Sequence, residues 1–172
     1  MKITTGRGDG GRTRMCGGKA VSKCDIRIKA QGALDELICL LGLAKTKIKD
    51  TASKRKIGLI QKDLFRMIAC ISAGGRKAGG IKDCDVRMLE HFGDSVEDRL
   101  RVPSGFVIPG VNEASAFLHV ARATARRAEC CAVEMQKRFR VYPAVLAYLN
   151  RLSDLLFILA LYEEGRPELL KR

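Results

Sequence analysis

The chain contains no tryptophan, and only 5% of its 172 residues are aromatic, although 47% are hydrophobic. Strands are enriched in aromatic and β-branched side chains, so a mainly aliphatic composition favours the packing of helices over a strand-rich fold. A chain of this length can bury a substantial core within one domain. We therefore expect a single helical domain.

Paired cysteines are missing as well. The seven cysteines are odd in number and include no C-x-x-C pair. They are Cys16, Cys24, Cys39, Cys70, Cys84, Cys130 and Cys131. This pattern indicates neither a disulfide framework nor a zinc site, so we expect buried or inert thiols. His91 and His119 are equally isolated, and ordinary packing or surface roles are expected for both.

The sequence also lacks a long apolar run and a leader. No run of about 18 apolar residues is present, which argues against a membrane span. No charged-then-apolar segment follows Met1, which argues against a secretory signal. We expect a cytoplasmic protein with no membrane partner.

Positive charge is abundant, because 32 Lys and Arg outnumber 19 Asp and Glu and give a net charge of +13. Such a chain attracts anions in general. The basic residues are spread along the chain, aromatic side chains that could stack on bases are few, and no nucleic-acid module is recognised. A polyphosphate substrate satisfies the same charge. We therefore expect no nucleic-acid partner, while a helical nucleic-acid binder stays as a lesser alternative.

The apolar spacing predicts five helices. They are expected at residues 26–44, 54–73, about 83–100, 112–140 and 143–165. Asp83 or Asp85 is expected to cap the third helix and Asn112 the fourth. Pro143 suits the first turn of the last helix, and Gly165 ends it. The sequence thus predicts an all-α, five-helix bundle with ferritin-like up-down packing over residues 26–165, in one domain of residues 1–172.

Three segments outside these helices are expected to be irregular. The basic cluster between Lys45 and Lys56 is predicted to be a solvated connection without chemistry. The link from Pro103 to Pro109 carries apolar side chains that would be costly to leave in water, so it should lie against the bundle or line a pocket. From sequence alone, core packing is the favoured prediction for Phe106. The tail, residues 166–172, is expected to be frayed.

Residues 1–25 are rich in glycine and show no helical period, which predicts a loop. Glycine tolerates positive φ, so such a loop can turn backbone N–H groups toward a phosphate, while Thr, Lys and Arg side chains add donors. Gly6 to Gly11 spells G-x-G-x-x-G, but only a few residues precede it and no helix pattern follows directly, so a Rossmann motif is excluded. A Walker A loop fails too, because Lys19 lacks the spaced glycine and precedes Ala20. A flexible terminus is the alternative.

Two polar stripes predict a site. Arg122, Arg126 and Glu129 fall at offsets of zero, four and seven and therefore share one helix face. Asn150 and Asp154 share a face of the next helix. A solvated, salt-bridged face is the ordinary alternative for such stripes. Small residues surround the arginines and permit close approach by a ligand or another helix. These are Ala121, Ala125, Ala128 and Ala132.

The same residues carry a resemblance to a family. Leu118–Arg122, Arg126–Glu129 and the run Tyr-Leu-Asn-Arg-Leu-Ser-Asp-Leu-Leu-Phe at residues 148–157 resemble the signature of PduO-type ATP:cob(I)alamin adenosyltransferases. The N-terminal part resembles the family too, in the same order along the chain. The matching positions there are Thr5, Gly8, Asp9, Gly11, Thr13, Ser22, Lys23, Asp25, Arg27 and Gly32 with residues 35–37.

The resemblance implies a homotrimer of five-helix bundles with an active site at each subunit interface. It implies transfer of the 5′-deoxyadenosyl group of ATP to the cobalt of a corrinoid, cob(I)alamin or cob(I)yrinic acid a,c-diamide, with release of triphosphate and assistance by Mg²⁺. A cob(II)alamin reductase and an adenosylcobalamin-dependent mutase are the implied protein partners. A delivery protein that binds ATP or adenosylcobalamin without efficient turnover is the alternative.

The resemblance also implies roles for single residues. Arg126 would neutralise charge on the leaving triphosphate, Asp35 would pair with Arg122 across the interface, and Phe106 would keep the lower axial ligand off cobalt. Asp35, Arg122 and Phe106 are thus the expected corrinoid contacts, and Glu129 a possible Mg²⁺ ligand. The expected ATP-binding residues are Thr5, Gly6, Gly8, Asp9, Gly11, Thr13, Ser22, Lys23, Arg126, Glu129 and Asn150.

The sequence departs from the family pattern at several positions. They are Gly6 and Arg7 in the loop, Lys29, Gln31 and Ile38 near the first helix, Val111 after Pro109-Gly110, and Cys130 after Glu129. The phosphate-binding set stays mostly intact, so these departures concern the corrinoid contacts above all.

Overall fold

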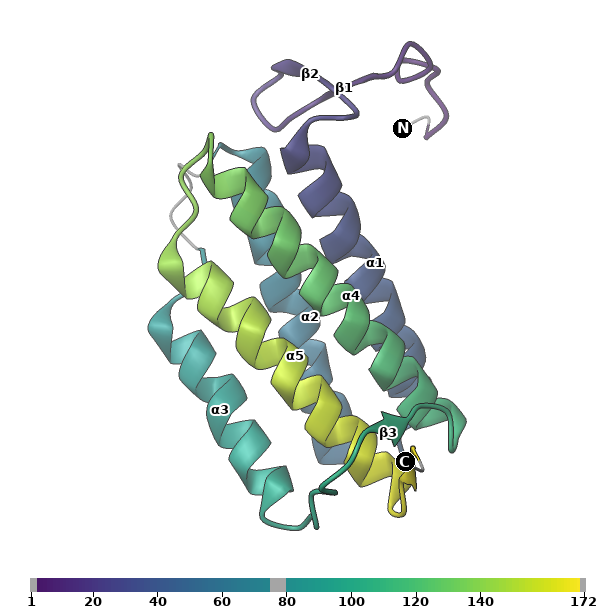
Figure 1. Cartoon of the computed structure of the whole chain (residues 1–172). Coiled ribbons are helices and arrows are strands. Elements are labelled where there is room, and N and C mark those ends of the chain that lie inside the picture. The colour runs from purple at the N-terminus through teal and green to yellow at the C-terminus, as the bar shows by residue number, and fades with distance from the viewer. Residues whose placement is uncertain (1–2, 75–79, 171–172) are drawn as a thin grey trace.

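The computed structural model describes residues 3–74 and 80–170, and within them the chain forms five helices (Figure 1). The helices are α1 Ile26–Lys47, α2 Thr51–Ser72, α3 Asp83–Glu97, α4 Glu113–Gln136 and α5 Pro143–Glu164. The predicted five-helix bundle is confirmed. The fourth helix ends at Gln136, short of the predicted Arg140.

Two small two-stranded antiparallel sheets accompany the helices and were not expected. The antiparallel strands β1 (Arg12–Arg14) and β2 (Ala20–Ser22) lie within the segment predicted as a loop. The strand β3 (Val107–Ile108) pairs with β4 (Glu168–Leu169). The prediction of a frayed tail is therefore wrong for residues 168–170, because the ladder to the link before α4 holds them in place. Residues 171–172 lie outside the described part of the chain.

The helix ends follow local chemistry. The Asp25 carboxylate caps α1 by accepting from the Arg27 N–H at 2.9 Å. Its hydrogen bond from the Arg27 guanidinium lowers the pKa of the Asp25 carboxyl from 3.8 to about 2. Asn112 caps α4 as predicted. At α3 the N-cap residue is Lys82 rather than Asp83 or Asp85, and Asp85 caps the helix from the first turn, since its carboxylate accepts from the Lys82 N–H at 2.8 Å.

The helix α4 lies between α1 and α5 and contacts both along their length (Figure 1). Five of the residues on its inward face are alanines that are at most 6% exposed. They are Ala114, Ala121, Ala125, Ala128 and Ala132. Large aliphatic side chains such as Leu37 of α1 and Leu152 of α5 fill the space that the alanines leave, and both are fully buried. The helix α2 packs on α1, and α3 packs on α5.

The helix α5 is long and apolar enough, by length and composition, to cross a membrane, with a mean hydropathy of 1.7 over 18 residues. Polar residues such as Asn150 and Asp154 nevertheless interrupt the stretch. Its inward apolar side chains, among them Leu149 and Leu156, are at most 1% exposed. This helix is therefore a core helix of the bundle.

Two other predictions about the surface need correction. The basic cluster between Lys45 and Lys56 is not a connection, because only residues 48–50 separate α1 from α2. Lys45 even joins the two helices, since its Nζ donates to Gln61 Oε1 at 2.8 Å. The seven cysteines are free, but the expected burial is wrong. Exposed thiols are those of Cys16, Cys24, Cys39, Cys84 and Cys130, and Cys70 and Cys131 are half-buried.

A buried polar network ties three helices together. The Tyr148 hydroxyl on α5 donates to Asp63 Oδ2 on α2 at 2.9 Å. Arg66 donates to Asp63 Oδ1 at 2.7 Å and lies 3.0 Å from Asp85 on α3. Burial and the neighbouring Asp63 carboxylate raise the pKa of the Tyr148 phenol, so this hydroxyl remains a donor at neutral pH.

Replacing Tyr148 by Phe removes one donor from a buried carboxylate and keeps the ring. We expect Tyr148→Phe to lower the free energy of unfolding by about 1–2 kcal/mol, because Asp63 Oδ2 loses its partner. The exposed Tyr162 offers a matched control, and Tyr162→Phe should leave stability within about 0.5 kcal/mol of wild type. Urea unfolding of the three proteins measures the difference, and equal midpoints for both variants would contradict the role given to the network.

Candidate active site

A groove of about 430 Å³ runs along one face of α4 and α5 beside the link that precedes β3. Its lining residues come from three parts of the chain. They are Gly105, Phe106 and Val107 of the link, His119, Arg122 and Arg126 of α4, and Ser153, Asp154, Phe157 and Ile158 of α5. Two guanidinium groups thus face an apolar wall, which suits a ligand with both anionic and apolar parts.

The two arginines differ in freedom. Arg122 is half-buried, its guanidinium carbon lies 5.9 Å from the centre of the Phe157 ring, and its Nε is buried without an acceptor in the described structure. Arg126, one turn along α4, is exposed, and none of the described residues pairs with it. The solvated face that was the ordinary alternative for this stripe therefore describes Arg126 and not Arg122. Arg126 is free to bind an anion.

The two polar stripes meet one turn beyond Arg126. Asn150 Nδ2 donates to Glu129 Oε1 at 3.4 Å, and Arg151 donates to Asn150 Oδ1 at 3.0 Å and to Asp154 at 3.1 Å. The structure thus brings together Glu129 and Asn150, which lie on different helices. Neither residue lines the groove itself, and the pair lies one turn beyond Arg126, which does.

Phe106 lies at the mouth of the groove and is 83% exposed, so the favoured prediction of core packing is wrong. Its backbone carbonyl accepts from the Leu170 N–H at 2.9 Å, next to the β3–β4 ladder. A fixed backbone with an exposed ring presents a flat apolar surface to whatever enters the groove.

A second cationic hollow, of about 460 Å³, lies in the N-terminal segment. Its lining residues are Thr5, Arg7, Gly8, Arg12, Thr13, Arg14 and Ala20. Of the predicted phosphate-binding residues, Thr5, Gly8 and Thr13 line it directly. None of the three arginines was predicted to bind phosphate, although the alternation of Arg12 and Arg14 around Thr13 is a strand pattern that could have revealed these two.

The other predicted loop residues shape this hollow. The Lys23 side chain lies against Gly8, where an added Cβ would come within 3.1 Å of Lys23 Nζ. The backbone N–H of Lys23 donates to the Gly11 carbonyl at 2.9 Å. Gly6 and Gly11 have φ of 66° and 72°, a region that favours glycine. The Asp9 N–H donates to the Gly6 carbonyl at 3.2 Å and closes a turn. Ser22 Oγ accepts from the Cys24 N–H at 3.1 Å, away from the lining.

The two hollows share no residue and lie apart within one chain. Figure 1 shows the β1–β2 hairpin beyond one end of the bundle, whereas β3 lies near the other end. Asp35 is exposed on α1 and has no partner among the residues described, so it does not meet Arg122 of the same chain. Its neighbour Glu36 instead pairs with Arg127.

The groove also contains a histidine that the sequence did not identify as a site residue. His119 is 4% exposed, and its Nε2 lies 3.2 Å from Oε1 of Glu164, whose side chain is fully buried. Desolvation lowers the pKa of the His119 imidazole, so it is neutral at pH 7. The two residues are 45 positions apart, and no local pattern signals their contact.

The departures from the family pattern fall in different environments. Ile38 is 6% exposed within the core, so it offers no side chain to a ligand. Lys29, Val111 and Cys130 are exposed, and Gln31 is half-buried with its Nε2 unpaired in the described structure.

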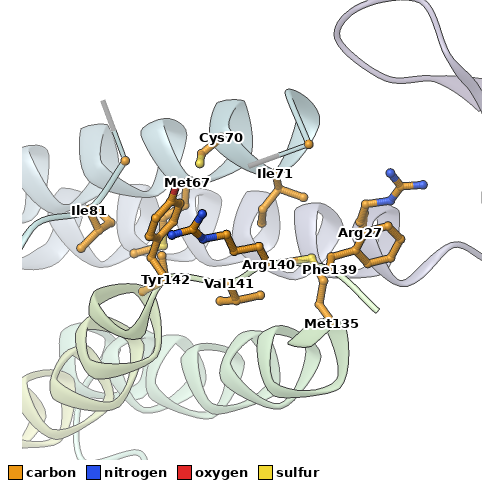
Figure 2. A pocket seen from close by; sticks show the side chains of 13 residues that line it. Arg27, Met67, Cys70, Ile71, Ile81, Met135, Phe139, Arg140, Val141 and Tyr142 are labelled. Carbon is orange, nitrogen blue, oxygen red and sulfur yellow. The ribbon is translucent and has the colours of Figure 1, made fainter. Parts of the chain in front are cut away.

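A third cavity is apolar and much smaller, about 40 Å³, and lies where the ends of α2, α4 and α5 meet (Figure 2). Met67, Met135, Val141 and other apolar residues line it. The Arg27 guanidinium packs over the Phe139 ring at 4.2 Å at its margin. It lacks the convergent polar groups of the two larger hollows, so we do not assign the chemistry to it.

Known proteins match this arrangement over almost the whole chain. The family described as cobalamin adenosyltransferase matches residues 3–163. A corrinoid adenosyltransferase of Citrobacter freundii is 36% identical, with 97% of each chain covered. A cobalamin adenosyltransferase of Cupriavidus metallidurans is 36% identical, with 92% of this chain and 86% of that protein covered.

Solved structures agree with the sequence comparison. A Phe-to-His variant of the PduO-type ATP:corrinoid adenosyltransferase of Lactobacillus reuteri, complexed with cobalamin and ATP, superposes with a TM-score of 0.91. It is 29% identical, and the match covers 99% of this chain and 97% of that one. With a matching family profile, relatives above one-third identity over nearly full length and the same fold, the chain belongs to the PduO-type corrinoid adenosyltransferases and has ATP:corrinoid adenosyltransferase activity.

Proposed function

We propose that this chain adenosylates cob(I)alamin with ATP at a site shared by neighbouring subunits of a homotrimer. The N-terminal hollow of one subunit would hold the triphosphate against the α4–α5 groove of the next. The observation that carries this proposal is the separation of two cationic hollows, of about 460 and 430 Å³, that share no residue in one chain. A reaction that joins a nucleotide to a corrinoid needs both surfaces together.

The chemistry matches what these residues offer. The electron pair of Co(I) forms the Co–C bond to the 5′ carbon of ATP, and the C–O bond breaks with its electrons leaving on triphosphate. No general base is needed. The reaction requires alignment of the two substrates and dispersal of negative charge on the leaving group. Arg126, exposed and unpaired among the described residues, supplies a bidentate donor for that charge, and Lys23 with the loop arginines holds the remaining phosphates.

The α4–α5 groove would bind the corrinoid. Asp35 is exposed and unpaired in its own chain as the structure describes it, which leaves it available to Arg122 of a neighbouring subunit. The exposed ring of Phe106 would occupy the face of the corrinoid from which the lower axial ligand departs. Loss of that ligand makes Co(II) easier to reduce, so Phe106 would act on the reduction potential.

Mg²⁺ fits this site as a companion of the nucleotide. The described residues contain no group of three His, Cys, Asp or Glu side chains that could hold a metal ion by themselves. Nucleotide-bound Mg²⁺ needs only one or two protein carboxylates besides phosphates and water. Glu129 would supply that oxygen, with Asn150 holding its carboxylate at 3.4 Å, and the bound ion would neutralise phosphate charge.

The chemistry also implies partners. Cob(I)alamin is generated by a one-electron reduction of cob(II)alamin, so a cytoplasmic reductase would supply the substrate. An adenosylcobalamin-dependent mutase would take the product. Both remain proposals, together with the cytoplasmic location.

An anaerobic assay with chemically reduced cob(I)alamin, ATP and Mg²⁺ tests the proposal, with Co–C bond formation followed by absorbance. We expect adenosylcobalamin and one triphosphate for each product. ATP binding without product would favour the alternative of a delivery protein. Binding to nucleic acid that falls steeply with salt and ignores ATP would favour the other alternative.

Removing the free arginine tests its role in charge dispersal. We expect Arg126→Ala to lower kcat by about 100-fold or more. The free energy of unfolding should stay within about 0.5 kcal/mol of wild type, because the Arg126 side chain is exposed. Arg87 of α3 is also exposed, and Arg87→Ala is the control for loss of one charge. A variant that unfolds would instead indicate that Arg126 has a structural role.

Mixing two inactive variants tests the shared site. Lys23→Ala disables the loop and Arg126→Ala disables the groove. If the site spans two subunits, trimers assembled from equal amounts of both should contain about a quarter of intact sites. Activity should therefore return on co-expression. No recovery, with mixed trimers demonstrated by mass spectrometry, would place both halves in one subunit.

The redox role of Phe106 predicts a dependence on the cobalt state supplied. We expect Phe106→Ala to lower the rate severely when cob(II)alamin and a reductant are given, and only about 10-fold with cob(I)alamin reduced beforehand. Phe65→Ala on α2, which removes another exposed ring, is the control. Equal losses with both substrates would remove the redox argument.

A further inference from the structure

We propose that Glu164 and His119 form a positioning relay that aims Arg122 into the groove, in which His119 Nε2 donates a hydrogen bond to Glu164 and Arg122 Nε donates one to His119 Nδ1. The inference rests on the proposed function, because it assumes that Arg122 acts in the corrinoid half of the site. Its basis, however, is a set of buried polar atoms in this chain.

The first part of the relay is already formed. Glu164 Oε1 and His119 Nε2 are 3.2 Å apart, at the wall of the groove. In the relay the Glu164 carboxylate accepts this hydrogen bond, so the neutral imidazole carries its hydrogen on Nε2. His119 Nδ1 is then an acceptor. It is buried, and no described atom donates to it.

The matching donor lies three residues along the same helix. Arg122 Nε is buried and lacks an acceptor in the described structure. Side chains three apart on a helix share a face. Both groups flank Phe157, since the His119 ring centre lies 6.0 Å and the Arg122 guanidinium carbon 5.9 Å from the centre of that ring. In the relay, Arg122 Nε donates to His119 Nδ1, which pairs the unsatisfied donor with the unsatisfied acceptor.

Charge supports the same arrangement. A fully buried carboxylate requires a nearby positive charge or strong donors. Desolvation lowers the pKa of the His119 imidazole, and the positive charge of Arg122 lowers it further. The imidazole is therefore neutral, although the Glu164 carboxyl beside it acts in the opposite direction. The other charged groups of the groove are Arg126 on α4 and Asp154 on α5, which is 57% exposed and pairs with Arg151. The cation that the imidazole links to Glu164 is therefore Arg122.

The consequence concerns orientation. With Nε held, the two terminal nitrogens of Arg122 remain free for a carboxylate or a corrinoid amide in the groove. A planar guanidinium fixed at one edge loses less freedom when its ligand binds. His119 and Glu164 touch no substrate in this arrangement, so they are positioning residues.

Nitrogen-15 NMR of the histidine rings tests the relay directly. The chain has two histidines, and the exposed His91 serves as the internal reference. In the wild-type enzyme at pH 7.5 we expect His119 in a single tautomer with hydrogen on Nε2. A ring with hydrogen on Nδ1, on both nitrogens, or averaged between tautomers would overturn the proposal, because none of these offers Arg122 a fixed acceptor.

Kinetics separate positioning from packing. In Glu164→Gln the amide can donate to Nε2 and shift the hydrogen to Nδ1. We expect this variant to lose the single tautomer and to show a roughly 10-fold loss in kcat/KM for cob(I)alamin, with KM for ATP unchanged. Glu163→Gln, the adjacent half-buried acid, is the matched control and should leave spectrum and kinetics unchanged.

The outcomes distinguish the two proposals. A wild-type enzyme that is active while folded Glu164→Gln keeps its corrinoid kinetics would overturn the relay alone. A wild-type protein that makes no product would overturn the proposed function, while its His119 tautomer would still decide whether the pair is formed as described. Should Glu164→Gln fail to fold, Glu164→Asp, which keeps the charge on a shorter side chain, must retain the Nε2–H tautomer for the relay to stand.

Discussion

The close packing of α4 is the constraint on which the rest of the structure depends. Its buried alanines let the helix axis approach both α1 and α5, and Arg122, Arg126 and Glu129 each follow one of these alanines by one position, on the flank of α4 that borders α5. A bulkier side chain at Ala125 or Ala128 would separate α4 from its neighbours. Glu129 meets Asn150 across the α4–α5 contact, so the distance between these two helices also determines whether this hydrogen bond can form. The buried Tyr148 network holds α5 from its other side.

Local signals made much of the bundle predictable. Asn112 and Pro143 start helices as the capping rules require, and Gly165, with φ of 66°, ends one. Helical spacing also identified the arginine stripe on α4. These features depend on residues a few positions apart, so they can be inferred from local sequence patterns.

Features that depend on distant residues were missed. The pairing of β3 with β4 joins segments about 60 residues apart, and neither segment has a strand pattern of its own. Phe106 reads as a core residue because nothing local shows that its ring remains outside. The contact of His119 with Glu164 is equally invisible, and only the family resemblance suggested that Asp35 acts together with Arg122.

The β3–β4 ladder joins the end of the chain to the link before α4, so the length of the turn after α5 and the length of that link depend on each other. Phe106 takes its position from the Leu170 N–H and from the two-residue ladder between β3 and β4. An insertion in the turn after α5 would shift the register of that ladder and withdraw the ring from the mouth of the groove, unless the link from α3 changed by a compensating amount. Among related sequences, the number of residues before the phenylalanine and the number after the last helix should therefore change together.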